Sequence, residues 1–184
     1  INVYNVDAQV AAILGTSQGN VKINDMAVHP KTGEVYVSNT DANNATRFEG
    51  TGEFAGSTVQ GNIAKSRITL IEPSSGKVRA RHLNTHIDYG DLKGNTSLKK
   101  HSVSTPLQMA IGADGSQLYS AVIGSNKIAI YNTAQLKDDS LWDGEGVEFD
   151  AIQADKSHIK VEGGPAGLLL NESKNSLYVF TRFD

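Results

Sequence analysis

The 184-residue sequence contains no cysteine, a single tryptophan and no long apolar run. Without cysteine, the chain has no disulfide bond, no thiolate metal site and no covalent attachment point for haem. No run approaches 18 apolar residues, so we expect no membrane-spanning helix. The formal net charge is −3 and no basic cluster is present, which argues against a nucleic-acid partner. The 39% of apolar residues are enough to bury the core of one domain.

A short strand-like motif occurs three times in the chain. Its copies are "EVYVSNT" (34–40), "QLYSAVI" (117–123) and "SLYVFTR" (176–182). They are anchored on Tyr36, Tyr119 and Tyr178, and a large apolar residue stands ten positions earlier in each case: Met26, Met109 and Leu168. Each copy reads as an apolar run, a polar turn and an alternating strand, which predicts a β-hairpin. The equivalent tyrosines are expected to pack equivalently between neighbouring units.

A second recurring unit predicts the remaining strands of each repeat. It reads "VYNVDAQVAAI" (3–13), "ITLIEPSSGKVRA" (68–80) and "IAIYNTAQL" (128–136). Val6, Ile71 and Tyr131 align. Each is followed by a polar residue that is expected to open a tight turn: Asp7, Glu72 and Asn132. A complete repeat therefore has four strands, which is typical of a β-propeller blade.

The sequence thus predicts an all-β fold, a β-propeller of four-stranded antiparallel blades, with about three blades' worth present. Residues 1–22 supply the third and fourth strands of one blade, 23–104 and 105–162 form two complete blades, and 163–184 supply the first two strands of another. Closed propellers have about 4–8 blades. We therefore expect a partial propeller whose open edges are covered by another chain or by further sequence.

The segments "INDMAVHPKTGEVYVSNT" and "ITLIEPSSGKVRARHLN" resemble the YVTN-type β-propeller family. "YVSN" matches that family's strand motif closely, whereas "LYSAV" and "LYVFT" lack its asparagine. The resemblance implies an exported protein, located in the periplasm, outside the cell or on its surface. It says little about activity, because propellers include both binding modules and enzymes.

The uneven spacing of the repeats indicates three insertions. Against a bare repeat of 42 residues, the excesses are 23 residues between the second and third strands, then 18 and 17 residues between successive blades. In an antiparallel blade these two kinds of connection lie on one face. All three insertions are therefore expected on one face, which is the predicted binding face.

The first insertion (41–66) is rich in oxygen-bearing side chains, including Asn43 and Asn44. Such side chains suit calcium, although the fixed spacing of a calcium-binding loop is missing. The alternative is a solvated loop tied down by Phe48 and Phe54.

The second insertion (82–104) contains His82, His86 and His101, together with Asp88 and Tyr89. The His-x-x-x-His spacing would place two imidazoles on one side of a helical turn, as metal ligands or as haem ligands. The alternative is a polar loop with surface histidines. Because loop length costs little stability, replacing residues 82–101 is expected to leave the fold intact.

The third insertion (136–162) places Trp142 among acidic residues. An exposed tryptophan there would stack on a sugar or anchor a protein partner, whereas a buried one would fill the gap between blades. Phe149 and Ile152 are candidates for the fourth strand of this blade.

Together, these features predict a non-catalytic binding module with a protein or glycan partner. The predicted binding residues are His82, His86, Asp88, Tyr89, Asn43 and Trp142, and no catalytic residue is assigned. No nucleophile elbow or phosphate-binding loop is present. The alternative is the propeller portion of a larger redox or hydrolytic enzyme, with haem or calcium as the conceivable cofactors.

Overall fold

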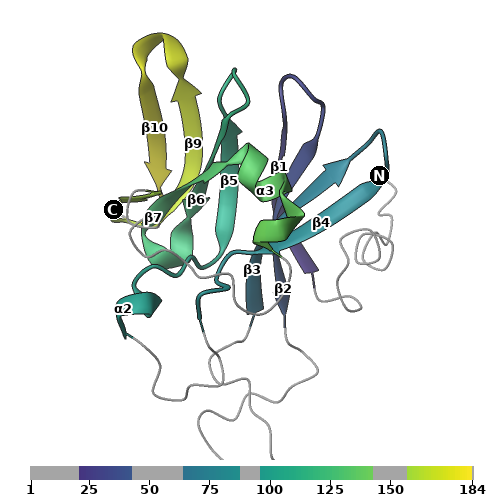
Figure 1. Cartoon of the computed structure of the whole chain (residues 1–184). Helices are drawn as coiled ribbons and strands as arrows, with labels where there is room; N and C mark the ends of the chain where they lie inside the picture. The colour runs from purple at the N-terminus through teal and green to yellow at the C-terminus, as the bar shows by residue number, and fades with distance from the viewer. Residues whose placement is uncertain (1–20, 43–63, 88–95, 143–156, 184) are drawn as a thin grey trace, which may run out of the picture.

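The structure, a computed structural model, describes residues 21–42, 64–87, 96–142 and 157–183. These residues form three antiparallel sheets of four, four and two strands (Figure 1). The expectation of an all-β fold built from antiparallel strands is confirmed. Within the described ranges the sheets form an open arrangement rather than a closed ring. Residues 1–20, assigned to two strands from the sequence, lie outside these ranges.

The first sheet is a simple meander in which each strand pairs with the next one along the chain. Its strands are β1 (Val21–Val28), β2 (Val35–Ala42), β3 (Ala64–Glu72) and β4 (Lys77–His82). The turn from β1 to β2 uses Gly33 at a φ of 74°, a conformation that glycine adopts without strain. In the β2–β3 pair, Val35 is opposite Ile71 and Tyr36 is opposite Leu70.

The second sheet repeats this order. Its strands are β5 (Pro106–Ile111), β6 (Gln117–Val122), β7 (Lys127–Asn132) and β8 (His158–Lys160). Leu118 is opposite Tyr131, as Val35 is opposite Ile71 in the first sheet. The fourth strand is thus β8, and the assignment of Phe149 and Ile152 to it was wrong; both residues lie outside the described ranges.

The third sheet is a hairpin of β9 (Pro165–Asn171) and β10 (Ser176–Thr181). Leu169 is opposite Tyr178, and Leu168 is opposite Val179. Among the described residues, the far edge of β10 has no strand partner. This sheet therefore contains only the first two strands of the repeat.

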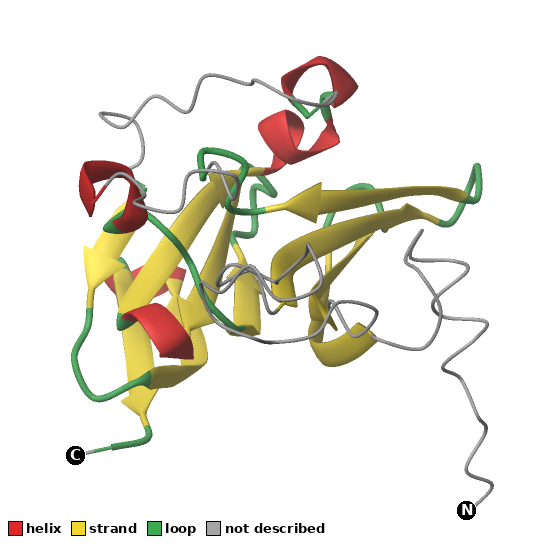
Figure 2. Cartoon of the chain, turned by 90° about the horizontal axis from the view of Figure 1, so that it is seen from below, coloured by secondary structure: helices red, strands yellow, loops and turns green. Residues whose placement is uncertain are grey.

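The three sheets pack face to face, with their first strands β1, β5 and β9 side by side. Figure 2, which views the chain from below, shows the sheets packed beside one another. One apolar cluster fills the space between the first and second sheets, and it includes Tyr36, Ile68 and Leu118. A second cluster lies between the second sheet and the hairpin and includes Ile128 and Leu168. Each fully buried aliphatic side chain contributes about 1.5–3 kcal/mol through the hydrophobic effect.

The repeated residues occupy equivalent strand positions but differ in burial. At the two interfaces between sheets, the tyrosine of the earlier sheet (Tyr36 or Tyr119) packs in the same cluster as the large apolar residue of the later sheet (Met109 or Leu168). Exposure is 0% for Tyr36, 6% for Met109 and 7% for Leu168, but 50% for Tyr178 and 65% for Met26. Tyr178 is exposed in the structure because no described sheet follows the hairpin, so its packing between blades stays a prediction.

The third insertion lies in a different place from the one predicted. It connects β7 to β8, within the second sheet, and contains α3 (Thr133–Lys137) and the 3-10 turn η3 (Asp139–Leu141). In an antiparallel meander this connection is at the opposite end from the other two insertions. The prediction of one common face is therefore wrong for this insertion. The spacing from Tyr131 to Leu168 could not reveal on which side of the three-residue β8 the extra residues lie.

The remaining helical elements are single turns. They are α2 (Thr96–Lys99), η2 (Ile123–Ser125) and η4 (Glu172–Lys174). The side chain of Asn132 caps α3 by accepting a hydrogen bond from the backbone of Gln135, as asparagine commonly does. None of the helices in the described ranges has the length and apolar content needed to cross a bilayer.

Candidate functional site

The sheets have two distinct ends. At the insertion end, β2 leads into β3 and β4 leads into β5, and this end carries the first two insertions. At the turn end, the tight β1–β2, β3–β4, β5–β6 and β9–β10 turns lie together, and β7 leads into α3 (Figure 1). The predicted histidine site belongs to the insertion end.

Two histidines of the second insertion lie at the end of the first sheet. His82 is the last residue of β4, and its Nδ1 atom is 3.3 Å from the carbonyl oxygen of Ser66. His86 lies in the turn that follows β4, so the helical turn suggested by the His-x-x-x-His spacing is not present. Burial lowers the pKa of His82, and burial together with the neighbouring His101 and His82 lowers the pKa of His86 to about 4.

A pair of hydrogen bonds brings the third histidine to the same place. The side chain of Asn84 donates to the carbonyl oxygen of Val103 and accepts from its backbone N–H, each at 2.8 Å. These bonds hold the segment that leads into β5 against the turn that follows β4. His101, which precedes Val103 and is 3% exposed, is thereby placed close enough to His86 to affect its pKa. The structure therefore gathers all three imidazoles.

The same contacts overturn the expectation that residues 82–101 are dispensable. Leu83 is 8% exposed and packs in the cluster between the first two sheets. Asn84 and His101 are also buried. Replacement of the whole segment would therefore remove core contacts.

The search for a metal-binding group among the described residues is negative. No group of three or more histidine, aspartate or glutamate residues in the described ranges is arranged to hold a metal ion. Asp88, Tyr89 and Asn43 lie outside those ranges, as does nearly all of the proposed calcium loop. Asp41, at the start of that loop, instead forms an ion pair with Arg67 at 2.9 Å.

Trp142 packs between the sheets instead of projecting as an anchor. Its ring is half-buried against the first apolar cluster, and its indole N–H donates to the carbonyl oxygen of Gln135 at 2.9 Å. The guanidinium carbon of Arg81 is 5.5 Å from the centre of the ring. These contacts favour the gap-filling interpretation.

The segment before Trp142 is fixed by ion pairs to the first sheet. Asp139 accepts from Lys77 at 2.7 Å, from Arg79 at 2.9 Å and from Arg81 at 2.7 Å. These three cations hold the pKa of Asp139 well below its usual value, with the largest effects from Lys77 and Arg81. Lys137 in addition pairs with Glu34. The third insertion thus links the second sheet to the first, which is a structural role.

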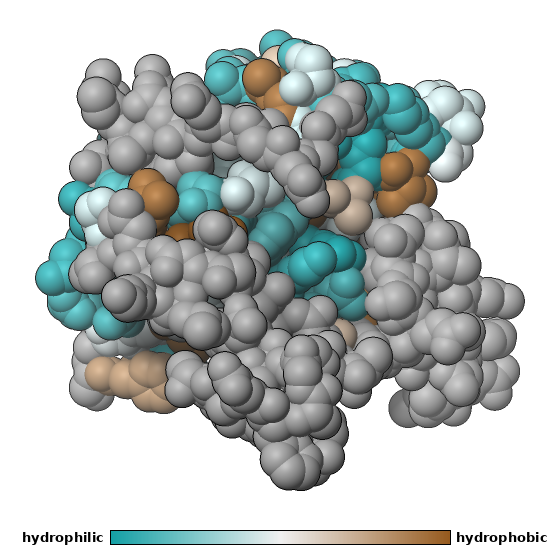
Figure 3. Space-filling model, turned by 60° about the horizontal axis from the view of Figure 1, so that its bottom comes forward, coloured by the Kyte–Doolittle hydropathy of each residue, from teal (hydrophilic) through white to brown (hydrophobic). Residues whose placement is uncertain are grey.

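Among the described residues, the insertion end carries more cationic than acidic side chains, which sequence reasoning missed. The exposed ones are Lys22, Lys99, Lys100, Lys160 and Arg182, and Lys65, Arg67 and Lys127 are partly buried. Within the described ranges, the carboxylates near the strand ends here are Asp41 and Glu162, and both are in ion pairs. Figure 3 turns this end forward and shows mainly hydrophilic residues on its described surface. These cations are far apart in the sequence, so no contiguous basic segment predicted that they would lie at one end.

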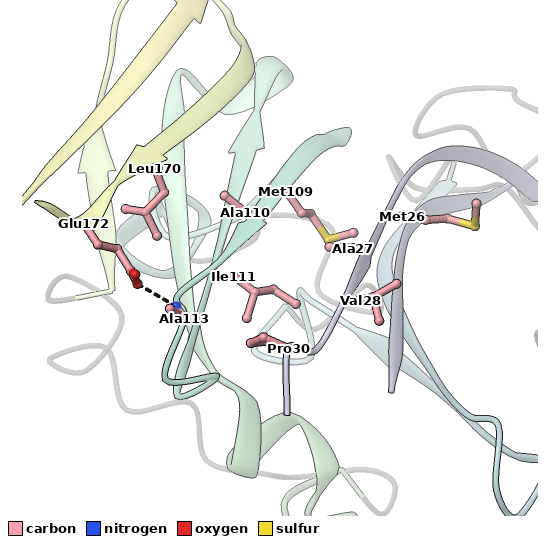
Figure 4. A pocket seen from close by; sticks show the side chains of 10 residues that line it. All are labelled: Met26, Ala27, Val28, Pro30, Met109, Ala110, Ile111, Ala113, Leu170 and Glu172. Atoms are coloured by element: carbon pink, nitrogen blue, oxygen red, sulfur yellow. Dashed lines mark hydrogen bonds between the residues drawn. The ribbon is translucent and has the colours of Figure 1, made fainter. Parts of the chain in front are cut away.

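The turn end has a different character. A groove of about 430 Å³ opens there between the first strands of the three sheets (Figure 4). Its walls combine apolar side chains, among them Pro30, Met109, Ile111 and Leu170, with a similar share of polar surface. The acidic group in its wall, Glu172, accepts a hydrogen bond from the backbone of Ala113 at 2.6 Å. This groove was also not predicted, because it arises only where three separate hairpins meet.

The chain was compared with known proteins at three levels: family models, curated proteins and solved structures. No family model matches the chain, and no curated protein matches it. Among solved structures, the chain is similar to hydrazine synthase of Kuenenia stuttgartiensis, with a TM-score of 0.55 and 18% sequence identity. The match covers 89% of this chain and 46% of that chain, so it spans less than half of the neighbour. The neighbour is a β-propeller-containing protein, and the likeness at this identity concerns the fold alone.

Proposed function

We propose that the three sheets are consecutive blades of a β-propeller of the YVTN type, in an exported or surface-associated protein. Two four-stranded meanders pack face to face with their first strands side by side, as blades do around a propeller axis. The likeness to a propeller-containing structure supports the same architecture. The "YVSN" motif (36–39) and the following hairpin motif support the family, and export is what that family implies.

The domain acts as a non-catalytic binding module, and an anionic partner docks on the insertion end. The observation that carries this function is the concentration of lysine and arginine side chains at that end, where the two described carboxylates are already in ion pairs. Complementary charge steers a partner and fixes its orientation. An acidic protein surface and an acidic glycan share the required chemistry, and the experiment below separates them.

A pair of charge reversals tests this function. In the variant Lys99→Glu/Lys100→Glu, two exposed cations of the insertion end become anions. Binding of a heparin oligosaccharide and of poly-glutamate is measured by calorimetry at low ionic strength. We expect the favoured probe to lose at least about tenfold in affinity, because each reversal replaces an attraction by a repulsion. Added salt should weaken binding of the unmodified protein.

The matched control is Lys31→Glu/Lys174→Glu at the turn end. It changes the net charge by the same amount and also replaces exposed side chains. We expect it to bind as tightly as the unmodified protein. Equal losses of affinity in both variants would show that only the net charge matters and not the insertion end. If the unmodified protein binds neither probe, the proposal of an anionic partner is refuted.

A further inference from the structure

The groove at the turn end combines apolar side chains with one carboxylate. Among the described residues that line it, Glu172 alone has a side chain with an oxygen or nitrogen atom. Met109 and Ile111 on β5 lie between the first sheet and Leu170 on β9 (Figure 4). The volume of about 430 Å³ is in the range of pockets that hold small organic molecules. A matching ligand therefore has an apolar body and a small polar group.

The polar surface of the groove belongs to Glu172 and to the backbone, and the backbone donors nearby are already used. Three N–H groups on the strands and turns around the groove donate to side chains: Met109 to Asp25 at 2.7 Å, Leu168 to Gln108 at 3.0 Å and Ala113 to Glu172 at 2.6 Å. The carbonyl oxygens of β5 that accept from side chains, those of Pro106 and Leu107, lie at the opposite end of the strand. The wall of the groove is therefore richer in hydrogen-bond acceptors than in donors.

The backbone of β5 directs some of these acceptors to the groove. Gly112 donates to the carbonyl oxygen of Gln117 at 3.0 Å, so its N–H points to the β6 side. Successive residues of an antiparallel strand point their backbone groups to opposite sides. Those of Ile111 and Met109 therefore point away from β6, as the bond from Met109 to Asp25 confirms. The groove lies on that side, because no residue of β2, β6 or β10 lines it.

Glu172 gives the groove a negative charge. It forms no ion pair within the described ranges, and no cationic side chain lines the groove. A second carboxylate lies beside it: a methyl group added to Gly112 would be 3.4 Å from Oε1 of Glu172 and 3.2 Å from Oδ1 of Asp114. A carboxylate only accepts hydrogen bonds, and its bonds to cationic donors are its strongest. The charge thus favours a cationic ligand with several N–H donors.

We propose that this groove binds a small aliphatic amine in its protonated form. The ammonium group donates to the second oxygen of Glu172 and to the carbonyl oxygens of Met109 and Ile111. The alkyl chain lies against the side chains of Ile111 and Leu170, where it is removed from water. The described wall contains no aromatic ring, so an aromatic cation would gain no stacking there. This site is at the opposite end from the proposed anion site and does not depend on it.

Methionine methyl NMR tests the site directly, because the chain has two methionines and both line the groove. Protein that is isotope-labelled at these methyl groups is titrated with hexylammonium, hexanol and hexanoate, which share an alkyl chain and differ in charge. The variant Met26→Leu assigns the two signals. We expect hexylammonium to shift the Met109 signal and to bind about fivefold more tightly than hexanol, whereas hexanoate should not bind. Ethylammonium should bind more weakly than hexylammonium, because it buries fewer methylene groups.

A charge-removing variant separates the carboxylate from the apolar walls. Glu172→Gln keeps an oxygen that can accept from Ala113 but removes the negative charge. It should lower the affinity for hexylammonium about fivefold and leave that for hexanol unchanged. Glu162→Gln is the matched control, since it also removes one exposed carboxylate, but at the insertion end. We expect the control to bind both probes as the unmodified protein does.

Three results would overturn the proposal. The first is equal affinity for hexylammonium and hexanol, which would show that the groove does not recognise the amine. The second is an unchanged NMR signal from both methionines when hexylammonium is added. The third is an equal loss of affinity in Glu172→Gln and Glu162→Gln, which would make the effect one of net charge. None of these results bears on anion binding by Lys99 and Lys100, so the two proposals fail separately.

Discussion

The inner interface between the first two sheets and the outer face of the hairpin are built from equivalent sequence positions. At the inner interface, Tyr36 is fully buried and Met109 is 6% exposed. On the outer face, Tyr178 is half exposed although it occupies the same place in its strand. The sequence motif sets where a side chain points, and the neighbouring sheet sets whether that direction is core or surface. The stability contributed by a repeated residue should therefore follow its neighbours and not its motif.

Truncation of the two tyrosines should give the largest contrast. Tyr36→Ala empties a fully buried site and should lower the free energy of unfolding by about 3–5 kcal/mol, as for other large aromatic truncations. Tyr178→Ala should cost less than about 1 kcal/mol, as for exposed positions. Urea denaturation measures both. Equal losses would contradict the difference in burial between the two faces.

A glycine at the inner interface offers a narrower test. A methyl group added to Gly115 would lie 2.2 Å from the His29 ring of the neighbouring sheet, and Gly115 has a φ of 79°. Gly115→Ala should therefore destabilise the domain by about 2 kcal/mol through overpacking and backbone strain. Gly76→Ala is the matched control, since Gly76 has a φ of 69° but no atom near the added methyl group. A control that loses as much stability would show that only the backbone strain matters.

The histidines at the insertion end predict a dependence of stability on pH. The folded protein lowers the pKa of His86 to about 4, mainly by burial, so the unfolded chain binds protons that the folded chain does not. Stability should be fully present above pH 6.5 and should fall as the pH drops towards 4, by about 2 kcal/mol after allowance for partial solvent access. His86→Gln should flatten this decline in urea titrations at several pH values. If the variant shows the same pH profile as the unmodified protein, groups other than His86 cause the decline in stability.

The ion pairs of α3 and η3 give a smaller test of how the first two sheets are joined. Asp139→Asn keeps the shape of the side chain but removes the charge that Lys77, Arg79 and Arg81 share. We expect a modest fall in melting temperature that high salt reduces, because exposed ion pairs are screened. Asp114→Asn is the control on the same end, since Asp114 bonds mainly to Ser116 in its own turn. A fall that is independent of salt would point to lost hydrogen bonds instead of charge.

Strand positions, hairpin turns and register could be predicted from the sequence alone. The alternation of apolar and polar residues around Tyr36 and Tyr119, and the alignment of Ile71 with Tyr131, are local patterns that the backbone of a strand obeys directly. The candidate site was predicted only in part. Histidine spacing indicated a cluster but predicted the wrong local structure, a helical turn. The cluster instead depends on Asn84 and Val103, which join two segments that are apart in the sequence.

The sequence by itself determined the antiparallel sheets, because period-two alternation and turn residues act over a few neighbouring positions. Tertiary structure alone decided which repeated tyrosine is buried, that Trp142 fills a gap between sheets, and that lysines from separate loops share one end. It also decided that the third insertion leaves from the turn end. These features depend on contacts between segments far apart in the chain, and such contacts arise only when the sheets stack and exclude water from between them.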